Sequence, residues 1–557
     1  MRCIVVKDFS RSTIYQIYVK SFCDSNGDGI GDINGIRFRL PYLSSLGIDT
    51  VWVTPFFRSP MNDNGYDISD YRSVNPMFGT MADVEAMLRE ADALDIGFMF
   101  DMVFNHTSTE HEWFQKALTG DPEYMDYYIF RDSVDGHAPT NWESKFGGSA
   151  WEYVPSLDKW YLHLFDVSQA DLNWENPRVR EELKDVIRFW KDKGVRGFRF
   201  DVVNLISKPD CFEDDHEGDG RRFYTDGHHV HEFLRELVAD TGIGDMVTVG
   251  EMSSTSLDNC VRYTRPADKE LSMCFSFHHL KVDYAGGDKW SLMAPDLVRL
   301  KALFAEWQQE MAAQGGWNAL FWCNHDQPRI VSRLGDDGRY WKASAKMLAT
   351  FIHLLRGTPF VYQGEEIGMT NAGFTHIDQY RDVESTNYYR ILLDRGLSEA
   401  EALNVLAQRS RDNARTPMQW DSGKYAGFSA SEPWIGLPDN ACEINVEAEE
   451  HDADSVLNYY RRLICLRREL PVISKGDVRF LETGNDRVLA YERTLNGDRL
   501  TVLCNFSDKE EAVQLEVEGQ TLIGSYVHSG EALHKGLLRP FEAVALAATS
   551  EEARKPH

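Results

Sequence analysis

Eight short runs rich in β-branched and aromatic residues recur along the chain, and each is followed by a stretch whose apolar residues have helical spacing. This alternation is typical of parallel strands joined by crossover helices. Eight such units predict an α/β fold whose strands close into a (β/α)8 TIM barrel, with an active site at the carboxyl ends of the strands. The runs cover residues 13–22, 50–57, 96–106, 195–203, 246–252, 271–279, 319–326 and 358–363.

Two long connections interrupt this alternation. The segment after the third run, 106–175, is far longer than the about two to six residues usual for a βα loop, so we expect an inserted subdomain B over the barrel mouth. A second excursion, from 368 to about 434, follows the eighth run and should lie at the same mouth. After subdomain B, Asn176-Pro177 predicts the start of a helix, because asparagine caps helices and proline suits their first turn.

The pattern changes again after residue 474. Segments such as 487–493 and 500–506 alternate apolar and polar residues as antiparallel strands do, and Asn496-Gly497 between them is a strong hairpin signal. A separate C-terminal antiparallel β domain is therefore predicted. The expected domains are the catalytic barrel at 1–105 and 176–474, subdomain B at 106–175 and the C-terminal β domain at 475–557.

The chain of 557 residues is acidic, with a formal net charge of −29 at pH 7. Such a surface disfavours nucleic acid and anionic membranes as partners, although a few local cations could bind one small phosphorylated molecule. The nine cysteines are scattered singly without zinc-ligand spacing and indicate free thiols in a reducing compartment. The N-terminus lacks the apolar run of a secretory signal, so we expect a cytoplasmic protein.

The fourth run, GVRGFRFDVVN, carries the first candidate for catalysis. Because strand side chains alternate, Arg199 and Asp201 should point to the same side, toward the barrel interior. A cation beside a carboxylate keeps it ionised, as a glycosidase nucleophile must be. The same two residues are also expected for a buried ion pair with a purely structural role.

Two further acids end other predicted strands. Glu251 follows the apolar run MVTVG, where loss of hydration would raise its pKa and suit it to proton donation. Asp326, next to His325 in NHDQP, could stabilise positive charge on a sugar ring. A capped loop or a satisfied ion pair explains any one of these acids, but their joint placement with His106 at the end of the third run favours catalysis.

Four segments resemble the signature regions of the alpha-amylase superfamily of glycoside hydrolases, in the family's order. They are DMVFNH (101–106), GFRFDVVN (197–204), VGEM (249–252) and NHDQ (324–327). Similar matches occur along essentially the whole chain, at QIYVKSF (16–22), GDGIGD (27–32), NDNGYD (62–67), QGEEIGM (363–369) and RDNARTPMQW (411–420).

The resemblance implies a retaining α-glucosidase with Asp201 as nucleophile, Glu251 as general acid/base and Asp326 as transition-state stabiliser. In that mechanism the two reacting carboxyls stand about 5 to 5.5 Å apart, and a glucosyl-enzyme ester forms and is hydrolysed. The resemblance also implies a pocket for the nonreducing glucose. Its residues would be Asp63, Tyr66, His106, Arg199, His325 and Arg415.

A glycine-rich loop after the first run predicts a structural calcium ion. Oxygen ligands recur at mostly alternate positions, at Asp24, Asn26, Asp28 and Asp32. An EF-hand is disfavoured because the twelfth loop position is Gly35 instead of a bidentate glutamate. The family resemblance adds the carbonyl of Ile30 to the ligands, and a metal-free loop of Asx turns is the alternative.

The leaving-group side carries the substrate prediction. Val202, directly after Asp201, resembles enzymes that act on linkages other than α-1,4. The segments SFHHLKVDYAGGDKW (276–290), GDGRRFYTDG (218–227) and GGWNALFWCNHDQPRIVSR (315–333) resemble the phosphotrehalases. By that resemblance Lys281 and Lys289 would hold a phosphate, with a solvated surface pair as the alternative. YAGGDKW departs from the family, which has proline and asparagine after the tyrosine.

The expected partner is therefore a small phosphorylated disaccharide. The resemblance implies hydrolysis of α,α-trehalose 6-phosphate to glucose and glucose 6-phosphate, and the alternative is an oligo-1,6-glucosidase acting on isomaltose-type substrates. A sugar isomerase is a third enzymatic possibility. A non-catalytic transporter subunit would share the barrel, but it should carry a membrane helix and need not keep all three acids.

Overall fold

Eight parallel strands form the barrel in the computed structural model, which describes residues 8–548. They are β1 (Ile14–Ile17), β2 (Thr50–Val53), β5 (Gly97–Met102), β11 (Gly197–Phe200), β12 (Val247–Met252), β13 (Met273–Ser276), β14 (Ala319–Leu320) and β15 (Thr358–Tyr362). Their order is β13-β12-β11-β5-β2-β1-β15-β14. A parallel bridge from Cys274 to Asn318, just before β14, closes the ring. The predicted (β/α)8 barrel is confirmed, and each strand lies within its predicted run.

Helices cover the outside of the barrel. They are α1 (Ile33–Leu46), α2 (Met81–Ala93), α5 (Pro177–Asp192), α7 (Val230–Thr241), α8 (Leu257–Thr264), α9 (Leu297–Ala313), α11 (Trp341–His353) and α16 (Val456–Glu469). Helix α5 begins as predicted, because the Asn176 side chain accepts the Arg178 N–H and Pro177 takes the first helical position. Trp190 on α5 is buried against Phe57 and Phe100, so the apolar face of this helix lies on the barrel.

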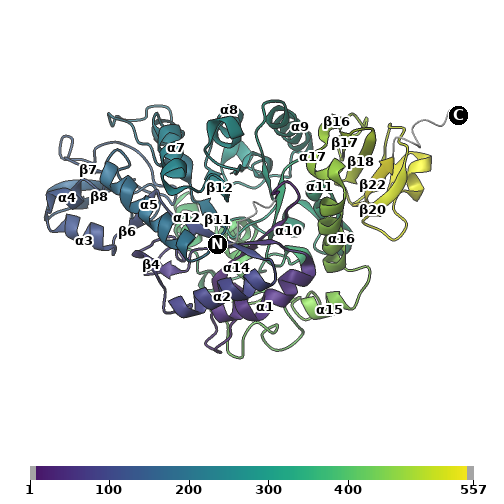
Figure 1. The fold of residues 1–557 in the computed structure, drawn as a ribbon, viewed down its shortest axis with the longest axis horizontal. Coiled ribbons are helices and arrows are strands. Elements are labelled where there is room, and N and C mark those ends of the chain that lie inside the picture. The colour runs from purple at the N-terminus through teal and green to yellow at the C-terminus, as the bar shows by residue number, and fades with distance from the viewer. Residues whose placement is uncertain (1–7, 549–557) are drawn as a thin grey trace.

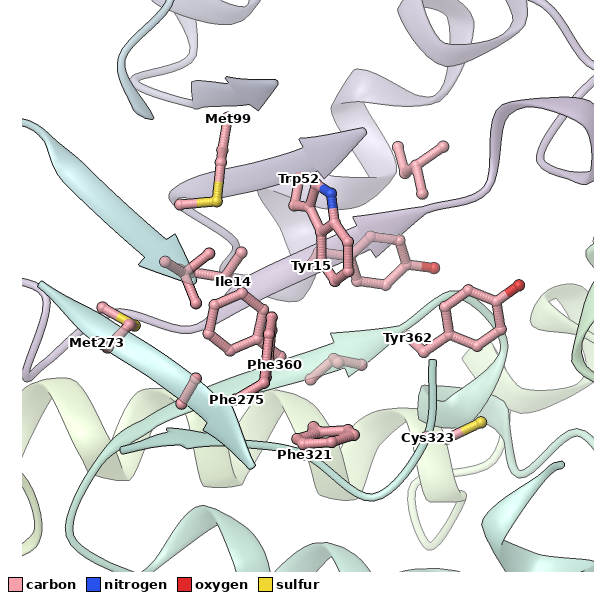
Figure 2. Close-up of a cluster of buried hydrophobic side chains, with 14 of the residues drawn as sticks. Ile14, Tyr15, Trp52, Met99, Met273, Phe275, Phe321, Cys323, Phe360 and Tyr362 are labelled. Atoms are coloured by element: carbon pink, nitrogen blue, oxygen red, sulfur yellow. The ribbon is translucent and has the colours of Figure 1, made fainter. Parts of the chain in front are cut away.

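Large side chains fill the barrel interior, as Figure 2 shows. The ring of Phe275 lies with its centroid 5.7 Å from Trp52, 4.6 Å from Phe360 and 5.0 Å from Phe321. These residues come from β13, β2, β15 and the segment after β14. Because the interior is packed, a ligand can enter only at the ends of the strands. Trp52 also connects this core to the polar rim, since its Nε1 donates to Asp101 Oδ2 at 3.1 Å.

Subdomain B follows β5. Strand β6 (His106–Ser108) pairs with β10 (Gln169–Asp171), and between them lie α3 (Glu112–Leu118), α4 (Pro122–Met125) and a sheet of β7 (Phe130–Arg131), β9 (Lys159–Leu162) and β8 (Trp151–Val154). A hydrophobic cluster around Trp142 and Trp151 packs the segment against Val202, Leu205 and Tyr224, which follow β11. Figure 1 shows this sheet at one end of the long axis of the molecule.

The excursion after β15 is helical. It contains α12 (Val383–Asp394), α13 (Glu399–Arg409) and α14 (Asp412–Arg415). Apolar residues of α12 and α13 pack with Trp290, which belongs to the loop after β13. The excursion therefore supports the loop that carries the two predicted phosphate lysines.

The C-terminal strands form the predicted antiparallel sheet, at the opposite end of the long axis in Figure 1. In sheet order they are β16 (Asp477–Leu481), β17 (Val488–Leu495), β18 (Asp498–Asn505), β22 (Ala543–Ala548) and β20 (Gln520–Gly524). Asn496 and Gly497 join β17 to β18 with φ values of 52° and 95°. Two successive positive φ values are what a tight hairpin turn requires, so the predicted turn is confirmed.

Two buried arginines lie where the β domain meets the barrel. Arg467 of α16 donates to the carbonyl oxygens of Ser10, His353, Leu355 and Gly357. Arg493 of β17 similarly donates to four carbonyl groups, those of Leu354, Ile473, Gly476 and Asp477. The C-terminal end of α11 is thus satisfied by arginines instead of water.

Two of the sequence predictions extend beyond the described residues. Cys3 and the outer ends of the first and last predicted domains lie outside 8–548. The eight cysteines within this range are all free thiols. No helix in the same range is both long and apolar enough to cross a membrane.

Candidate active site

Arg199 is the centre of the charged cluster at the carboxyl ends of β5, β11 and β12. Its Nη1 donates to Asp101 Oδ1 at 2.7 Å and to Asp201 Oδ1 at 2.6 Å, and its Nη2 contacts Glu251 Oε2. The prediction that Arg199 and Asp201 point to the same side is confirmed. One guanidinium therefore orients the predicted nucleophile and the predicted proton donor together.

The backbone turns sharply after Asp201. Val202 has φ 36°, a left-handed conformation that β-branched residues rarely adopt. The turn leads into the short helical segment η2 (Val203–Leu205) and leaves both Asp201 and Val202 on the wall of the cavity. Strain of this kind is retained where the position of a side chain matters, as for an attacking carboxylate.

Glu251 is set up as a proton donor. Burial raises the pKa of its carboxyl group well above the ordinary value, and the neighbouring Asp201 and Asp326 raise it further, against the opposing effect of Arg199. The carboxyl group therefore holds its proton to a higher pH than a free glutamate does. This is the form that can give a proton to a leaving oxygen.

Asp326 has the opposite character. Burial alone would raise its pKa, but His325, Arg411 and Arg415 outweigh burial and hold the pKa below the ordinary value. Arg415 Nη2 lies 2.7 Å from Asp326 Oδ1, and Arg411 Nη1 lies 3.4 Å from the same atom. Asp326 stays ionised and carries the negative charge that a cationic transition state needs.

The predicted glucose-binding residues Asp63 and Tyr66 lie between β3 (Phe57–Arg58) and β4 (Asp70–Val74). The Tyr66 hydroxyl donates to Asp101 Oδ2 at 3.0 Å, and its ring stacks on His325 with centroids 5.2 Å apart. His106 Nε2 lies 3.1 Å from the Tyr66 carbonyl oxygen. These contacts fix the Tyr66 ring and the two imidazoles beside the predicted catalytic acids.

A cavity of about 270 Å³ brings the predicted groups together. Among its lining residues are Asp63, Tyr66, His106, Asp201, Glu251, Asp326, Lys281 and Lys289. Three other predicted residues do not line the cavity but are buried behind its wall, where they contact its acids. They are Arg199, His325 and Arg415. Phe146, Phe165 and Phe277 add apolar surface, so the cavity suits a small sugar held by a few polar groups.

Arg411 is a cavity residue that the sequence prediction did not single out. Its Nη2 lies 3.0 Å from Asp63 Oδ1 and 2.5 Å from Asp382 Oδ1, and its Nε lies 3.4 Å from Glu384 Oε2. Arg411 and Arg415 are four residues apart around α14, a spacing that places two side chains on one helix face. That spacing in RDNARTPMQW was the available signal for Arg411.

The two predicted phosphate lysines differ in their contacts. Lys289 Nζ forms an ion pair with Glu384 Oε2 at 2.6 Å. Lys281 lines the cavity, and no hydrogen-bond or ion-pair partner for its ammonium group occurs within residues 8–548. Burial, with Arg221 and Arg299, lowers the pKa of Lys281. Lys281 thus has the hydrogen-bonding capacity to receive an anion.

The loop that carries these lysines is held in place by ion pairs between Asp283 and two buried arginines. Asp283 accepts from Arg333 Nε at 2.8 Å and from Arg409 Nη1 at 2.5 Å, and all three side chains are buried. The residues that depart from the family pattern are Ala285 and Gly286, and Gly286 and the following Gly287 have φ of 63° and 83°. Glycine adopts this turn without strain, so the loop closes without the family's proline.

The predicted calcium loop is held by internal hydrogen bonds. Asp24 accepts the N–H groups of Asn26, Gly27 and Gly29 at 2.9, 2.7 and 2.8 Å. Asp28 accepts the N–H of Ile30 at 2.9 Å, and Asp32 caps α1 by accepting that of Gly35 at 2.7 Å. No group of three or more His, Cys, Asp or Glu side chains within 8–548 is gathered for a metal. The calcium ion stays a prediction.

Comparisons with known proteins agree with this geometry. The family model for the alpha amylase catalytic domain matches residues 16–476, and that for the maltogenic amylase C-terminal domain matches 478–527. The chain is 49% identical over 546 residues to a trehalose-6-phosphate hydrolase of Bacillus subtilis, covering 96% of this chain and 97% of that one.

Two further similarities bear on the substrate. The chain is 46% identical over 550 residues to an oligo-1,6-glucosidase of Parageobacillus thermoglucosidasius, covering 96% and 98% of the two chains. The crystal structure of a Bacillus licheniformis trehalose-6-phosphate hydrolase superposes with a TM-score of 0.92 at 50% identity, covering 97% and 99%. Together with the family match over most of its length, these similarities show that the chain belongs to the alpha-amylase family of glycoside hydrolases.

Proposed function

We propose that the chain hydrolyses α,α-trehalose 6-phosphate to glucose and glucose 6-phosphate with retention of the α configuration. The observation that carries this proposal is Lys281, whose ammonium group lacks a partner among residues 8–548 and lines the same cavity as Asp201, Glu251 and Asp326. In a protein of net charge −29, such a local cation makes this part of the cavity favourable for an anion. The similarity to proteins named trehalose-6-phosphate hydrolase supports the same choice.

In the first step the Asp201 carboxylate attacks the anomeric carbon of the unphosphorylated glucose. The bond from that carbon to the bridging oxygen breaks, and Glu251 gives its proton to the oxygen. Glucose 6-phosphate leaves, and a β-glucosyl ester remains on Asp201. The raised pKa of Glu251 supports its role as the donor.

In the second step Glu251, now ionised, takes a proton from a water molecule. The water oxygen attacks the anomeric carbon, and Asp201 leaves as a carboxylate, so α-glucose is released and Glu251 is protonated again. In both steps Asp326 faces the ring while positive charge develops on it. Its pairing with Arg415 keeps it ionised throughout.

The test compares kcat/KM for trehalose 6-phosphate, trehalose and isomaltose. We expect a strong preference for the phosphorylated sugar, and Lys281→Ala should lower kcat/KM for that substrate by about tenfold to a hundredfold, because hydrogen bonds to charged groups are worth about 1.5–3 kcal/mol. Lys301→Ala is the matched control, since Lys301 lies on α9, outside the cavity, and pairs with Glu482. Faster cleavage of isomaltose, unaffected by Lys281→Ala, would contradict the proposal.

An oligo-1,6-glucosidase is the second candidate. It is favoured by the similarity to the Parageobacillus enzyme, and Val202 on the cavity wall is compatible with both candidates. In this case the leaving sugar carries no charge, and Lys281 would contribute little to binding. The same kinetic comparison separates the two candidates, because only the phosphotrehalase should lose its substrate preference when Lys281 is replaced.

We also propose that calcium binds the loop after β1 in a structural role. Carboxylate and amide oxygens at Asp24, Asn26, Asp28 and Asp32, with the Ile30 carbonyl, support this proposal by their chemistry. The ion would stabilise the loop and take no part in either chemical step.

A cytoplasmic location is likewise proposed, since a charged sugar phosphate is retained inside cells and the described cysteines are free thiols.

A further inference from the structure

Lys145 of subdomain B lines the same cavity as Lys281. The two lysines come from different parts of the chain, because Lys145 lies in the loop between β7 and β8, whereas Lys281 follows β13. Lys145 is held in place by its backbone N–H, which donates to the Leu164 carbonyl at 2.9 Å, and by the buried neighbours Ser144 and Phe146. The side chain therefore projects into the cavity from a fixed backbone.

The ammonium group of Lys145 has unused hydrogen-bonding capacity. Its one hydrogen bond within residues 8–548 goes to Ser253 Oγ at 3.3 Å, and no carboxylate of that part of the chain lies within ion-pair distance. Burial, reinforced by the positive charges of Arg221 and Lys281, lowers the pKa of Lys145 to about 8. A cation in this setting is destabilised until an anion approaches it.

The other cations at the cavity are already neutralised. Lys289 is paired with Glu384, and Arg411 contacts Asp63, Asp382 and Glu384. Arg221, outside the lining, forms a bidentate pair with Asp219. Lys145 and Lys281 are thus the two cavity lysines that lack an anionic partner within 8–548.

From this juxtaposition we propose that Lys145 is a specificity-determining residue that binds the phosphate of the leaving glucose together with Lys281. The inference rests on the proposed function and names a further group for the same site. A phosphate dianion has enough acceptor oxygens to bond to both ammonium groups and to relieve their mutual repulsion. Because one lysine belongs to subdomain B and the other to a barrel loop, the phosphate connects the two walls of the cavity. Lys289 is already paired with Glu384 and is not one of the two lysines in this proposed contact.

The experiment measures inhibition of 4-nitrophenyl α-glucoside hydrolysis by the two products. In the wild-type enzyme, glucose 6-phosphate should bind the leaving-group side more tightly than glucose. Lys145→Ala should raise its inhibition constant by about tenfold to a hundredfold and change that of glucose much less. Lys145→Arg should restore part of the affinity, because it keeps the charge. The same variants should lower kcat/KM for trehalose 6-phosphate in the same order.

Lys159→Ala is the matched control. Lys159 belongs to the same subdomain and pairs with the exposed Asp132, so both inhibition constants should stay at the wild-type values. If Lys145→Ala folds poorly, Lys145→Gln keeps the length and polarity of the side chain and removes the charge. Equal inhibition constants for glucose 6-phosphate in the wild type, Lys145→Ala and Lys145→Gln would overturn the inference and leave the proposed function standing. A wild-type enzyme that does not prefer glucose 6-phosphate over glucose would overturn both.

Discussion

Arg199 Nη1 donates to Asp201 Oδ1 at 2.6 Å. Because a guanidinium keeps its protons at every pH at which proteins are folded, the contacted oxygen of Asp201 always has a hydrogen-bond donor. Arg199 also contacts Asp101 and Glu251. Replacing one of the acids therefore leaves the arginine with other anionic partners.

The first prediction concerns Asp201→Asn. The amide has nearly the shape of the carboxylate but cannot form the glucosyl ester, so kcat should fall at least about a thousandfold. The fold should be retained, since Arg199 keeps its ion pair with Asp101. Glucose release and the thermal unfolding midpoint should be measured on one preparation. Turnover within tenfold of wild type would show that Asp201 is not the nucleophile.

The second prediction concerns Glu251→Gln and the leaving group. A sugar oxygen needs a proton to depart, whereas 4-nitrophenolate leaves without one, so the variant should lose much more activity on trehalose 6-phosphate than on 4-nitrophenyl α-glucoside. The second step still lacks its base, and the nitrophenyl substrate should give a burst of nitrophenolate followed by slow turnover. Equal losses on both substrates without a burst would speak against the acid/base role.

The third prediction concerns pH. A phosphate monoester has a second pKa of about 6, and the pKa of Lys145 is about 8. Glucose 6-phosphate should therefore bind best between these values, weakening below as the phosphate gains a proton and above as Lys145 loses one. The other groups that act on Lys145 are Arg221, Asp219, Lys281 and Asp171. Inhibition constants from pH 5 to 10 test this, with glucose as the uncharged comparison.

In Lys145→Gln, the binding of glucose 6-phosphate should weaken less at alkaline pH. The weakening at acid pH should remain, because it comes from protonation of the ligand's phosphate. If binding in this variant weakens at alkaline pH as it does in the wild type, the group that loses its proton is Lys281, whose pKa is also lowered by burial. The experiment thus distinguishes two lysines that occupy one cavity.

The sequence predicted those features that depend on local pattern. Strand alternation placed Arg199 and Asp201 on one side, and Asn496-Gly497 identified a hairpin, because both depend on residues close together in the chain. Arg411 was missed, since its contact with Asp63 spans 348 residues. Lys145 was missed for the same reason: only the folded position of subdomain B brings it to the cavity that Lys281 lines.

The fourth prediction concerns calcium. If the loop binds the ion only in the folded state, unfolding should become harder by about 2.7 kcal/mol when free calcium is one hundred times its Kd. Asp28 is the residue to replace, because its side-chain hydrogen bonds stay within the loop, with Asn26 and Ile30. Asp28→Ala should abolish the calcium effect on the thermal midpoint and leave kcat close to wild type. Equal midpoints in chelator and in excess calcium would refute the site.

The fifth prediction concerns the joint between the barrel and the β domain. Arg467→Leu leaves four carbonyl groups without their donor, at Ser10, His353, Leu355 and Gly357. Because unsatisfied buried polar groups are costly, the free energy of unfolding should fall by about 3–5 kcal/mol.

Arg462→Leu is the matched control for this change, since Arg462 lies on the same helix, α16, and is exposed. An exposed substitution should change the free energy of unfolding by no more than about 0.5 kcal/mol. Urea unfolding followed by fluorescence measures both variants. Equal effects of the two substitutions would mean that water replaces the guanidinium at these carbonyls. A selective loss in Arg467→Leu would instead show that the end of α11 and the turn that follows it depend on one buried cation.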